Sequence, residues 1–326
     1  MESQPPLVSV VVPVRDRRAL LRDLLTALTA QTWTNYEVVV VNDGSTDASA
    51  DEAYAAAARG LPVTVVESSG VGAVAGRQTG VLAARGEYLA FTDSDCAPDP
   101  EWLAAGVAAL EAGADVVQGR TVPARAMCPQ ERSLSAGEEG LYPTCNVFYR
   151  RGAFEAAGGF DRAAAERLRF RPGRRLRGVG FGEDTLVAWR VRRAGRAVYA
   201  PEAVVRHHVF PRDGLESLRR AWSTGAFPGL VREVPELRAT MLVGGLFLEG
   251  PGRVGLYAAV VCAAAGWRRG AGVAALTWAV GRARRVLVGD GSPARALCVL
   301  PLDLAADAVT AAALLLGSAR ARTPVL

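Results

Sequence analysis

The chain has 326 residues, of which 50% are hydrophobic and 22% are charged, and its formal net charge is +5. This length and composition exclude wholesale disorder and allow one large α/β domain or two smaller ones. The chain contains no lysine, and its arginines are not interleaved with aromatic residues, so no nucleic-acid partner is expected. Five scattered cysteines without a CxxC pair predict free thiols in a reducing compartment.

The first part of the chain alternates apolar runs with helical patterns. Four near-continuous apolar runs predict strands that are covered on both faces: 8–14, 38–41, 63–66 and 88–92. Leucines at helical spacing predict a helix at 20–28, and a third helix is predicted at 72–84. Between them, the turn residues 42–47 lead into a predicted Ala-rich helix. This alternation predicts an α/β fold with a doubly wound, mostly parallel sheet.

The middle of the chain is less regular, and we find no internal repeat in it. Helices are predicted at 100–110 and 184–194, the second with an apolar face. Strands are predicted at three β-branched or aromatic runs: 116–122, 144–150 and 204–208.

The composition changes after about residue 239, where three apolar segments begin: 241–266, 270–280 and 297–317. A membrane-spanning helix needs about 20 apolar residues, and only the first and last segments come near that length. Both carry ionisable groups, and arginines flank the middle segment as at cytoplasmic juxtamembrane positions. We expect membrane attachment through one or two spans or an interfacial hairpin, and a soluble Ala/Leu-rich helical bundle is the alternative.

Polar side chains follow the first, second and fourth predicted strands: Arg15, Asp43 and Asp93. In open α/β sheets, ligands bind beyond the carboxyl ends of the strands. Asp93-Ser94-Asp95 places two carboxylates one residue apart at such an end. Hard oxygen ligands select Mg²⁺ or Mn²⁺, which complete their coordination with substrate phosphates, so this motif predicts a divalent metal site.

Three segments, in this order, resemble the successive signatures of glycosyltransferase family 2: 8–15, 41–47 and 85–95. The downstream Gly158-Gly159-Phe160-Asp161 and Gly182-Glu183-Asp184-Thr185 are similar to that family's acceptor-side motifs. The resemblance implies the A-type glycosyltransferase fold with a Rossmann-like half, a nucleotide-diphospho-sugar donor such as a UDP-sugar, and a metal-assisted inverting transfer. The products would be cell-envelope polysaccharides, glycolipids or other glycoconjugates.

The resemblance, which covers about residues 7–210, and the change in composition after residue 239 together predict two domains. Residues 1–235 would form the catalytic domain, with a nucleotide-sugar-binding half at 7–122 and an acceptor half at 123–235. Residues 236–326 would form the apolar helical tail, which is expected to be associated with a membrane.

On the donor side, the resemblance implies that Pro13 and Arg15 line the nucleotide pocket and that Asp43 accepts hydrogen bonds from the base or ribose. Arg77 would meet the diphosphate, where its guanidinium pairs phosphate oxygens. The family commonly has asparagine after this arginine, whereas this chain has Gln78. Asp93 and Ser94 would also contact the donor. Asp93, Asp95 and His207 would bind the metal, the histidine because segment 203–207 resembles a metal-binding segment of some members.

On the acceptor side, the resemblance implies that Asp184 is the general base that takes the proton of the acceptor hydroxyl. A carboxylate that only stabilises a helix N-terminus is the structural alternative. The other expected acceptor-side residues are Asn146, Gly159, Phe160, Asp161 and Glu183. Leu186 replaces the family's usual acidic residue, so the acceptor stays open, and a lipid-linked glycan is compatible with it.

Two further expectations concern location. The Arg-rich segment 167–177 is either a solvated loop or a lid that contacts the donor diphosphate or a phosphate-bearing lipid acceptor. Residues 1–7 lack the basic and apolar regions of a secretory signal, so we expect the enzyme at the cytoplasmic face of the membrane.

Three alternative functions remain open. A nucleotidyltransferase usually has a Gly-rich phosphate loop after its first strand, and residues 14–17 contain no glycine. A catalytically silent nucleotide-sugar-binding membrane scaffold would retain the fold without turnover. A processive polysaccharide synthase would carry a Q-x-x-R-W signature, which Arg219-Arg220-Ala221-Trp222 matches only loosely.

Overall fold

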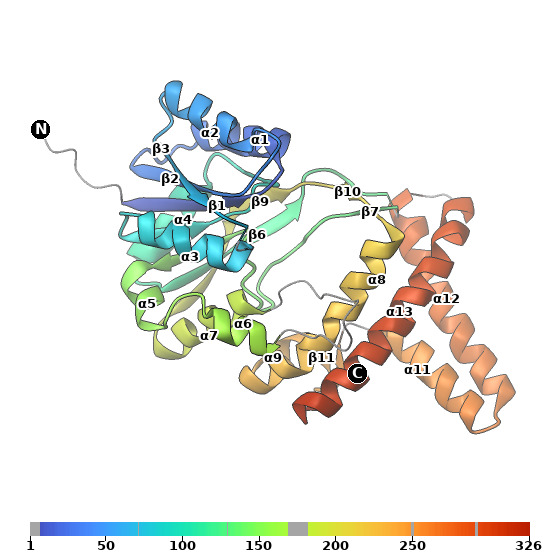
Figure 1. Ribbon diagram of the computed structural model, residues 1–326. Coiled ribbons are helices and arrows are strands. Elements are labelled where there is room, and N and C mark those ends of the chain that lie inside the picture. Colours follow the sequence, from blue (N-terminus) through green and yellow to red (C-terminus); the bar gives the residue numbers. More distant parts are fainter. Residues whose placement is uncertain (1–6, 71, 129, 169–181, 249–250, 291–292) are drawn as a thin grey trace, which may run out of the picture. The chain divides into compact units, whose positions relative to one another are not determined.

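The computed structural model describes residues 7–326 except 71, 129, 169–181, 249–250 and 291–292 (Figure 1). Its contacts divide the chain into two compact units. The sheet unit comprises Met1–Ala124, Ser133–Ala165 and Gly182–His208. The helical unit comprises Arg125–Arg132, Glu166–Phe181 and Val209–Leu326.

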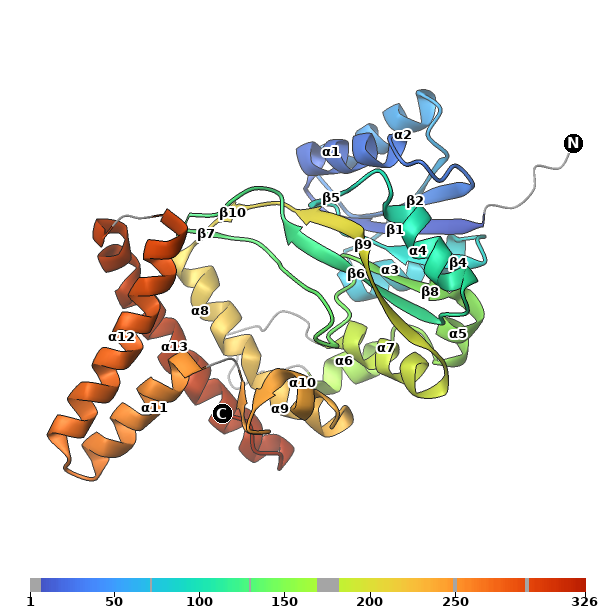
Figure 2. The same cartoon turned by 180° about the vertical axis from the view of Figure 1, so that it is seen from behind.

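The sheet unit is built on an eight-stranded sheet with the strand order β3-β2-β1-β4-β8-β6-β9-β5 (Figures 1 and 2). Its strands are β1 (Val8–Val14), β2 (Tyr36–Asp43), β3 (Val63–Ser68), β4 (Tyr88–Phe91), β5 (Cys96–Pro98), β6 (Val116–Pro123), β8 (Val147–Arg150) and β9 (Ala197–His207). Strands β1 to β4 are parallel to one another, as predicted. The other half is mixed, because β8 is antiparallel to β4 and β6, and β5 is antiparallel to β9.

The predicted strand 204–208 is the end of a longer strand. β9 begins at Ala197 and continues through Pro201, although proline cannot donate to a sheet ladder. The pairing of β9 with β6 shifts register between Gly119 and Arg120, opposite this segment. The irregularity removes the need for a donor at the proline, so the strand continues.

Helices cover both faces of the sheet: α1 (Arg18–Thr29), α2 (Ser49–Ala58), α3 (Ala73–Ala83), α4 (Trp102–Glu111), α5 (Arg151–Ala156) and α7 (Glu183–Ala194). The short helix α6 (Arg162–Leu168) follows α5 along the chain. α1 buries four leucines at helical spacing in the same core cluster as Val10 and Val12 of β1. Val11 lies between these two valines on β1, and its side chain points to the other face of the sheet, where it meets Gly80 of α3. Alternation along the buried strand therefore explains why both faces are apolar.

Gly80 gives a direct test of how closely α3 packs on the sheet. A Cβ at this position would lie 2.5 Å from Val11 Cγ1 and 3.0 Å from Val41 Cγ2. Gly80→Ala is therefore expected to lower the free energy of unfolding by about 1–3 kcal/mol, measured by chemical denaturation. Gly152→Ala is the control, because a Cβ on Gly152 of α5 would meet nothing within 4 Å. Equal stabilities for the two variants would contradict this packing.

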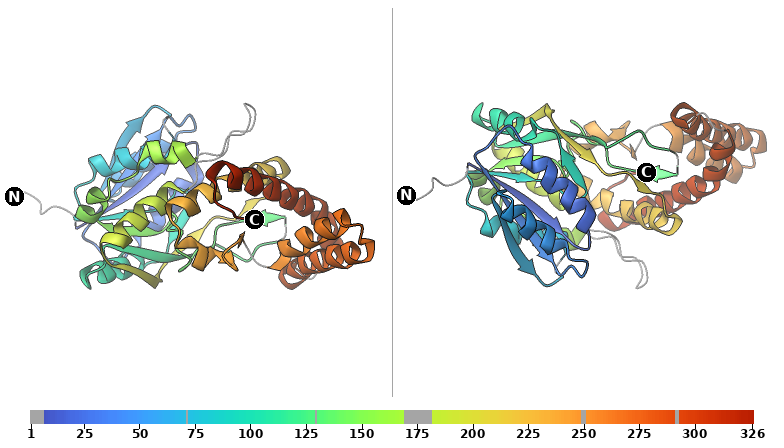
Figure 3. Two further views of the ribbon diagram at one scale, coloured as in Figure 1. Left: turned by 90° about the horizontal axis from the view of Figure 1, so that it is seen from below. Right: turned by 90° about the horizontal axis from the view of Figure 1, so that it is seen from above.

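The helical unit consists mainly of helices, with two short strand pairs (Figure 3). Its helices are α8 (Gly214–Ser223), the 3₁₀ turn η1 (Thr224–Ala226), α9 (Phe227–Glu233), α10 (Leu237–Met241), α11 (Pro251–Ala264), α12 (Arg268–Asp290) and α13 (Pro293–Ala321). The strand pairs are β7 (Glu131–Arg132) with β10 (Phe210–Pro211), and β11 (Leu242–Val243) with β12 (Phe247–Leu248).

The last three helices correspond to the three apolar segments in the sequence. α11 and α12 lie side by side as a hairpin, and α12 also contacts α13 (Figure 3). Within the described part of the chain, one segment, Cys298–Ala321, is long and apolar enough to cross a membrane. This finding rests on length and composition, and an apolar core helix of a soluble protein meets the same two criteria.

Candidate active site

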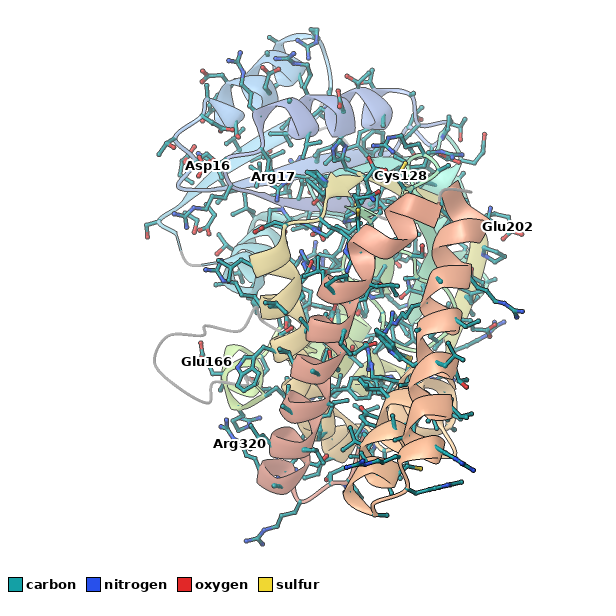
Figure 4. All side chains as sticks on the ribbon, turned by 90° about the vertical axis from the view of Figure 1, so that its right-hand side faces the viewer. Asp16, Arg17, Cys128, Glu166, Glu202 and Arg320 are labelled. Atoms are coloured by element: carbon teal, nitrogen blue, oxygen red, sulfur yellow. The ribbon has the colours of Figure 1, made fainter. Side chains whose placement is uncertain are left out.

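The parallel strands β1, β2 and β4 direct three predicted site segments to one edge of the sheet. β1 pairs in parallel with both β2 and β4, so their carboxyl ends lie together. The loops that follow β1 and β2 are tied to each other. Asp16 Oδ1 accepts hydrogen bonds from the amide (2.7 Å) and the hydroxyl (3.1 Å) of Thr46. Figure 4 labels Asp16 and Arg17, just before α1.

Asp43 ends β2 and is buried at this edge. Its carboxylate accepts hydrogen bonds from Ser68 Oγ at 3.0 Å and from the Gly72 amide at 2.8 Å. Because a carboxylate offers about four acceptor positions, Asp43 can hold this loop and still accept hydrogen bonds from a ligand. Pro13 is half-buried, and the Arg15 side chain is exposed at the end of β1.

A buried ion pair joins α3 to the segment after β4. The Arg77 side chain is 8% exposed, and its Nη2 donates a hydrogen bond to Asp93 Oδ1 at 2.5 Å. Burial alone would lower the pKa of Arg77, but the charge and hydrogen bond of Asp93, together with the charges of Glu183 and Asp184, raise it. Arg77 therefore lies within the electrostatic reach of the Asp93 segment and of the start of α7.

The pairing of β5 with β9 brings Asp95 next to His207. Cys96 lies opposite His207 in this register, and the His208 amide donates to the Asp95 carbonyl at 2.8 Å. His207 Nε2 lies 3.7 Å from Asp95 Oδ1. His207 Nδ1 lies 2.9 Å from the His208 carbonyl oxygen and 3.1 Å from Ser133 Oγ. These contacts hold the ring with Nε2 on the side of Asp95, and a contact of this kind to the second ring nitrogen is common in metal-binding histidines.

Ligand atoms of Asp95, Cys96 and His207 all lie within 4.8 Å of one another. The pKa of the Cys96 thiol is raised well above its ordinary value by a hydrogen bond to Cys145 and by burial. A protonated thiol is a poor metal ligand, so Asp95 and His207 are the ligands that this cluster offers to a hard cation. Asp93 lies outside the cluster, and its Oδ1 accepts the hydrogen bond from Arg77.

Asp184 lies in the first turn of α7, with Glu183 before it. Burial, followed by the negative charge of Glu183, raises the pKa of Asp184 to about 7. Three groups oppose this shift and hold the charged form: the amides of Thr185 and Thr144, and the charge of Arg77. A carboxylate with a pKa near neutrality can accept a proton efficiently from a reacting hydroxyl at physiological pH.

The face of α7 that carries Thr185 also holds the segment that leads to Thr144. The side chains of Thr185 and Trp189 donate to the carbonyls of Leu141 (2.6 Å) and Gly140 (2.8 Å). The next turn adds a hydrogen bond from Arg192 to the Tyr142 hydroxyl at 2.9 Å, and Tyr142 has a positive φ of 51°. These bonds fix a strained backbone next to the amide that contacts Asp184.

Several polar atoms at the site are buried and, among the residues that the structure describes, have no hydrogen-bond partner: Arg77 Nε, Thr92 Oγ1, Tyr149 Oη and Glu183 Oε2. Burial raises the pKa of Tyr149 well above its ordinary value, and the charge of Asp184 adds to this effect. Unpartnered buried polar atoms are costly unless another group satisfies them. Their position beside Arg77 and Asp184 is compatible with a ligand that supplies the partners.

Asn146, which was predicted on the acceptor side, lies in the core of the sheet unit. Its side chain is fully buried. It accepts a hydrogen bond from Trp102 Nε1 at 2.8 Å and donates to the carbonyls of Arg120 (3.0 Å) and Ala203 (2.9 Å). With these bonds Asn146 holds β6, β9 and α4 together, which gives it a structural role.

The Gly158–Asp161 motif forms a compact turn. Gly159 has a positive φ of 59°, and the Phe160 amide donates to Gln78 Oε1 at 3.2 Å, which gives Gln78 a structural role. The Phe160 ring packs on Phe91 at 5.1 Å between centroids, and Asp161 accepts from the Ala164 amide at 2.9 Å. These contacts place the motif on the same side of the sheet as α3.

The structure brings three of the predicted site residues close to Arg77: Asp93, Glu183 and Asp184. It also places Asp95 next to His207. Ser94 is buried between the two aspartates. Sequence reasoning missed Cys96, Tyr149 and the Thr144 amide, and no local pattern marks them. Most of the predicted Arg-rich loop, including Arg174 and Arg175, lies outside the described residues.

Comparisons with known proteins agree with this architecture. Residues 9–160 match the family model "Glycosyl transferase family 2". The glycosyltransferase AglE of Haloferax volcanii is 32% identical over 49% of this chain and 58% of its own length. The pre-mycofactocin glycosyltransferase of Mycobacterium tuberculosis is 28% identical over 73% of this chain and 50% of its own length. The chain thus spans little more than half the length of these relatives.

Two solved structures share the fold. The mannosyltransferase PcManGT of Pyrobaculum calidifontis, in complex with GDP-Man and Mn²⁺, has a TM-score of 0.61 at 20% identity, covering 95% of this chain and 88% of that one. TarS 1–349 of S. aureus, in complex with UDP, has a TM-score of 0.51 at 21% identity, covering 71% and 65%. The α/β prediction is therefore confirmed. Residues 9–160 of the chain are a glycosyltransferase family 2 domain.

Proposed function

We propose that this chain transfers a sugar from a nucleotide-diphospho-sugar to an acceptor hydroxyl with inversion at the anomeric carbon. The observation that carries the proposal is the pairing of Arg77 with Asp93 within electrostatic reach of a carboxylate, Asp184, whose pKa is about 7. A cation for the leaving diphosphate and a base for the acceptor are the two groups that an inverting displacement requires.

In this reaction Asp184 takes the proton of the acceptor hydroxyl as its oxygen attacks the anomeric carbon of the donor. The bond from that carbon to the diphosphate oxygen breaks, and its electron pair leaves with the nucleotide diphosphate. Arg77 contacts the diphosphate and exchanges part of its interaction with Asp93 for phosphate oxygens. Asp43 accepts hydrogen bonds from the base or ribose, beside Pro13 and Arg15.

Asp95 and His207 would hold a divalent cation, Mn²⁺ or Mg²⁺, with Asp93 and Ser94 beside it at the phosphates. The 3.7 Å distance between His207 Nε2 and Asp95 Oδ1, with the contacts that hold His207 Nδ1, supports this assignment. When bound, such a cation neutralises the charge that develops on a leaving diphosphate. The Mn²⁺ and GDP-Man of the Pyrobaculum structure, and the UDP of the Staphylococcus one, support the same choice of ligands.

On the acceptor side, Glu183, Gly159, Phe160 and Asp161 would shape the site around Asp184. We propose an acceptor from cell-envelope glycan or glycolipid synthesis, with a lipid-linked glycan as the preferred class. The apolar C-terminal helices, including Cys298–Ala321, support a position at the cytoplasmic face of a membrane.

A donor screen tests the proposal. UDP-, GDP- and dTDP-sugars are each incubated with the purified chain and Mn²⁺, and both the free sugar and the nucleotide diphosphate are measured. We expect one sugar nucleotide to release nucleotide diphosphate. A nucleotidyltransferase would consume nucleoside triphosphate and release pyrophosphate instead, and a silent binding module would bind the diphosphate without turnover. Either result would overturn the proposal.

The rate of transfer should depend on pH through Asp184. Its carboxylate must be ionised to accept a proton, and its pKa is about 7. At saturating substrate we therefore expect the rate to rise about tenfold per pH unit below this pKa and to level off above it. The measurement is a pH–rate profile with Mg²⁺ as the metal. A profile that is flat through this range would show that another group, or no titrating base, accepts the proton.

A further inference from the structure

The outer face of α12 carries an apolar stripe with an arginine at each end. The stripe consists of Arg269, Val273, Leu276, Val280 and Arg284, at spacings that place all five on one face of the helix. All five side chains are exposed, including Val273 at 67% and Leu276 at 63%. Exposed apolar side chains that are contiguous on one helix face indicate an interaction surface, whereas scattered ones do not.

The inner face of the same helix takes part in a charged cluster. Trp278 Nε1 donates to Asp307 Oδ2 of α13 at 2.9 Å, and Arg282 on the same face pairs with Asp307. Arg253 of α11 donates from Nε to Asp307 Oδ1 at 3.2 Å. These helices thus enclose a charged cluster around Asp307, while Val273, Leu276 and Val280 of α12 face outward. A surface helix of a globular protein in water usually presents polar side chains on its outer face.

The positive charge of the α11–α12 hairpin favours an anionic partner. Residues 251–289 contain six arginines and no aspartate or glutamate. Arg268, Arg269 and Arg284 are exposed, and Trp267 at the turn between α11 and α12 is 64% exposed. Arginine and tryptophan side chains prefer the boundary between lipid headgroups and acyl chains. A second copy of this face would bring together surfaces of the same positive charge, so self-association is disfavoured.

The length of the stripe determines how it meets a bilayer. At 1.5 Å per residue, the distance from Arg269 to Arg284 is about 22 Å. The hydrocarbon core of a membrane is about 30 Å thick, so a segment with charges at this spacing is too short to cross it. A helix with one apolar face and flanking arginines lies instead in the plane of the interface.

We infer that the outer face of α12, with the turn at 266–269, docks on the headgroup region of an anionic lipid bilayer. This inference rests on the membrane position proposed above. It adds that α12 is the element that binds the membrane and that the lipids are anionic. The apolar side chains enter the acyl boundary, while the arginines at the two ends of the stripe contact lipid phosphates.

The test is flotation of the full chain with vesicles of phosphatidylcholine alone or mixed with phosphatidylglycerol. One variant removes the charges (Arg269→Gln with Arg284→Gln), and another removes the apolar groups (Val273→Ser, Leu276→Ser and Val280→Ser). Leu82→Ser is the control, because Leu82 of α3 is 81% exposed in the sheet unit. Wild-type protein and the control should bind the anionic vesicles. The charge variant should bind them at least about tenfold more weakly, and the apolar variant should lose binding.

Further outcomes separate this inference from the proposed function. A variant of the exposed face of α13 (Leu304→Ser, Leu315→Ser and Leu316→Ser) should bind like wild type. If it loses binding while the α12 variants keep it, α13 is the membrane element and our inference is wrong. If wild-type protein does not float, both the inference and the membrane position fail. Release of nucleotide diphosphate in solution, unchanged in all these variants, would leave the catalytic proposal intact.

Discussion

Asp184→Asn is expected to lower the rate of sugar transfer at saturating substrates by about 10²–10⁴-fold, the usual contribution of a general base. The amide keeps the size of the side chain and can still contact the Thr185 amide, which lies 2.8 Å from Asp184 Oδ1. It cannot take a proton from the acceptor. Binding of nucleotide diphosphate, measured by calorimetry, should remain close to that of wild type, because Arg77 and Asp93 are unchanged.

Stability provides a second readout for the same variant. The pKa of Asp184 is 3.8 in the unfolded chain and about 7 in the fold, so the folded state binds the extra proton between these values. The stability that this group contributes is therefore lost as the pH rises from about 4 to about 7. Above that range wild-type protein carries the cost of a buried charge, and Asp184→Asn should have a higher Tm.

A control variant makes the comparison specific. Glu155→Gln removes a carboxylate that is 57% exposed and lies 3.7 Å from its partner Arg151. Both its transfer rate and its Tm should match those of wild type. If Asp184→Asn retained most of the activity, or lost nucleotide diphosphate binding in parallel with activity, Asp184 would not be the base.

The first half of the sheet could be predicted because its signal is local. Each of β1, β2 and β4 is buried on both faces, which produces a near-continuous apolar run that a single sequence displays. The polar residues that follow these runs lie at one sheet edge because the strands are parallel. The positions of Asp43 and Asp93 follow from this rule alone.

β5 could not be predicted in the same way. It has three residues, and it exists as a strand because Cys96 and Pro98 pair with the end of β9, more than a hundred positions away. That pairing also brings His207 to Asp95. From the sequence, the histidine could be suggested only through the resemblance to a family, because proximity across a sheet leaves no local pattern.

Asn146 shows why the type of a residue does not determine its role. An asparagine next to a strand end has the chemistry of a ligand contact, but its three partners here are distant in sequence: Trp102, Arg120 and Ala203. Asp184 shows the converse. The sequence motif implied that Asp184 is a base. The raised pKa of Asp184 comes from burial and from the charge of Glu183, and burial arises only when the chain folds.

Asp95→Ala is expected to reduce transfer by about 10³-fold, because a bound divalent cation contributes several kcal/mol to stabilising the leaving diphosphate. The variant should also bind nucleotide diphosphate more weakly, and this binding should no longer increase with added Mn²⁺. His207→Ala should show the same pattern to a smaller degree, since Nε2 of this histidine faces the Asp95 carboxylate at 3.7 Å. The measurement is a calorimetric titration of nucleotide diphosphate at several Mn²⁺ concentrations.

Cys96→Ala is the matched control for the metal site. The thiol belongs to the same cluster, yet its raised pKa keeps it protonated, so its loss should change neither the rate nor the Mn²⁺ dependence. Asp184→Asn supplies the opposite control, because it should lose the rate and retain the Mn²⁺-dependent binding. A metal dependence that survived in Asp95→Ala, or disappeared in Cys96→Ala, would require a different set of ligands. Because Asp93 already accepts a hydrogen bond from Arg77, the site has few other carboxylates to offer.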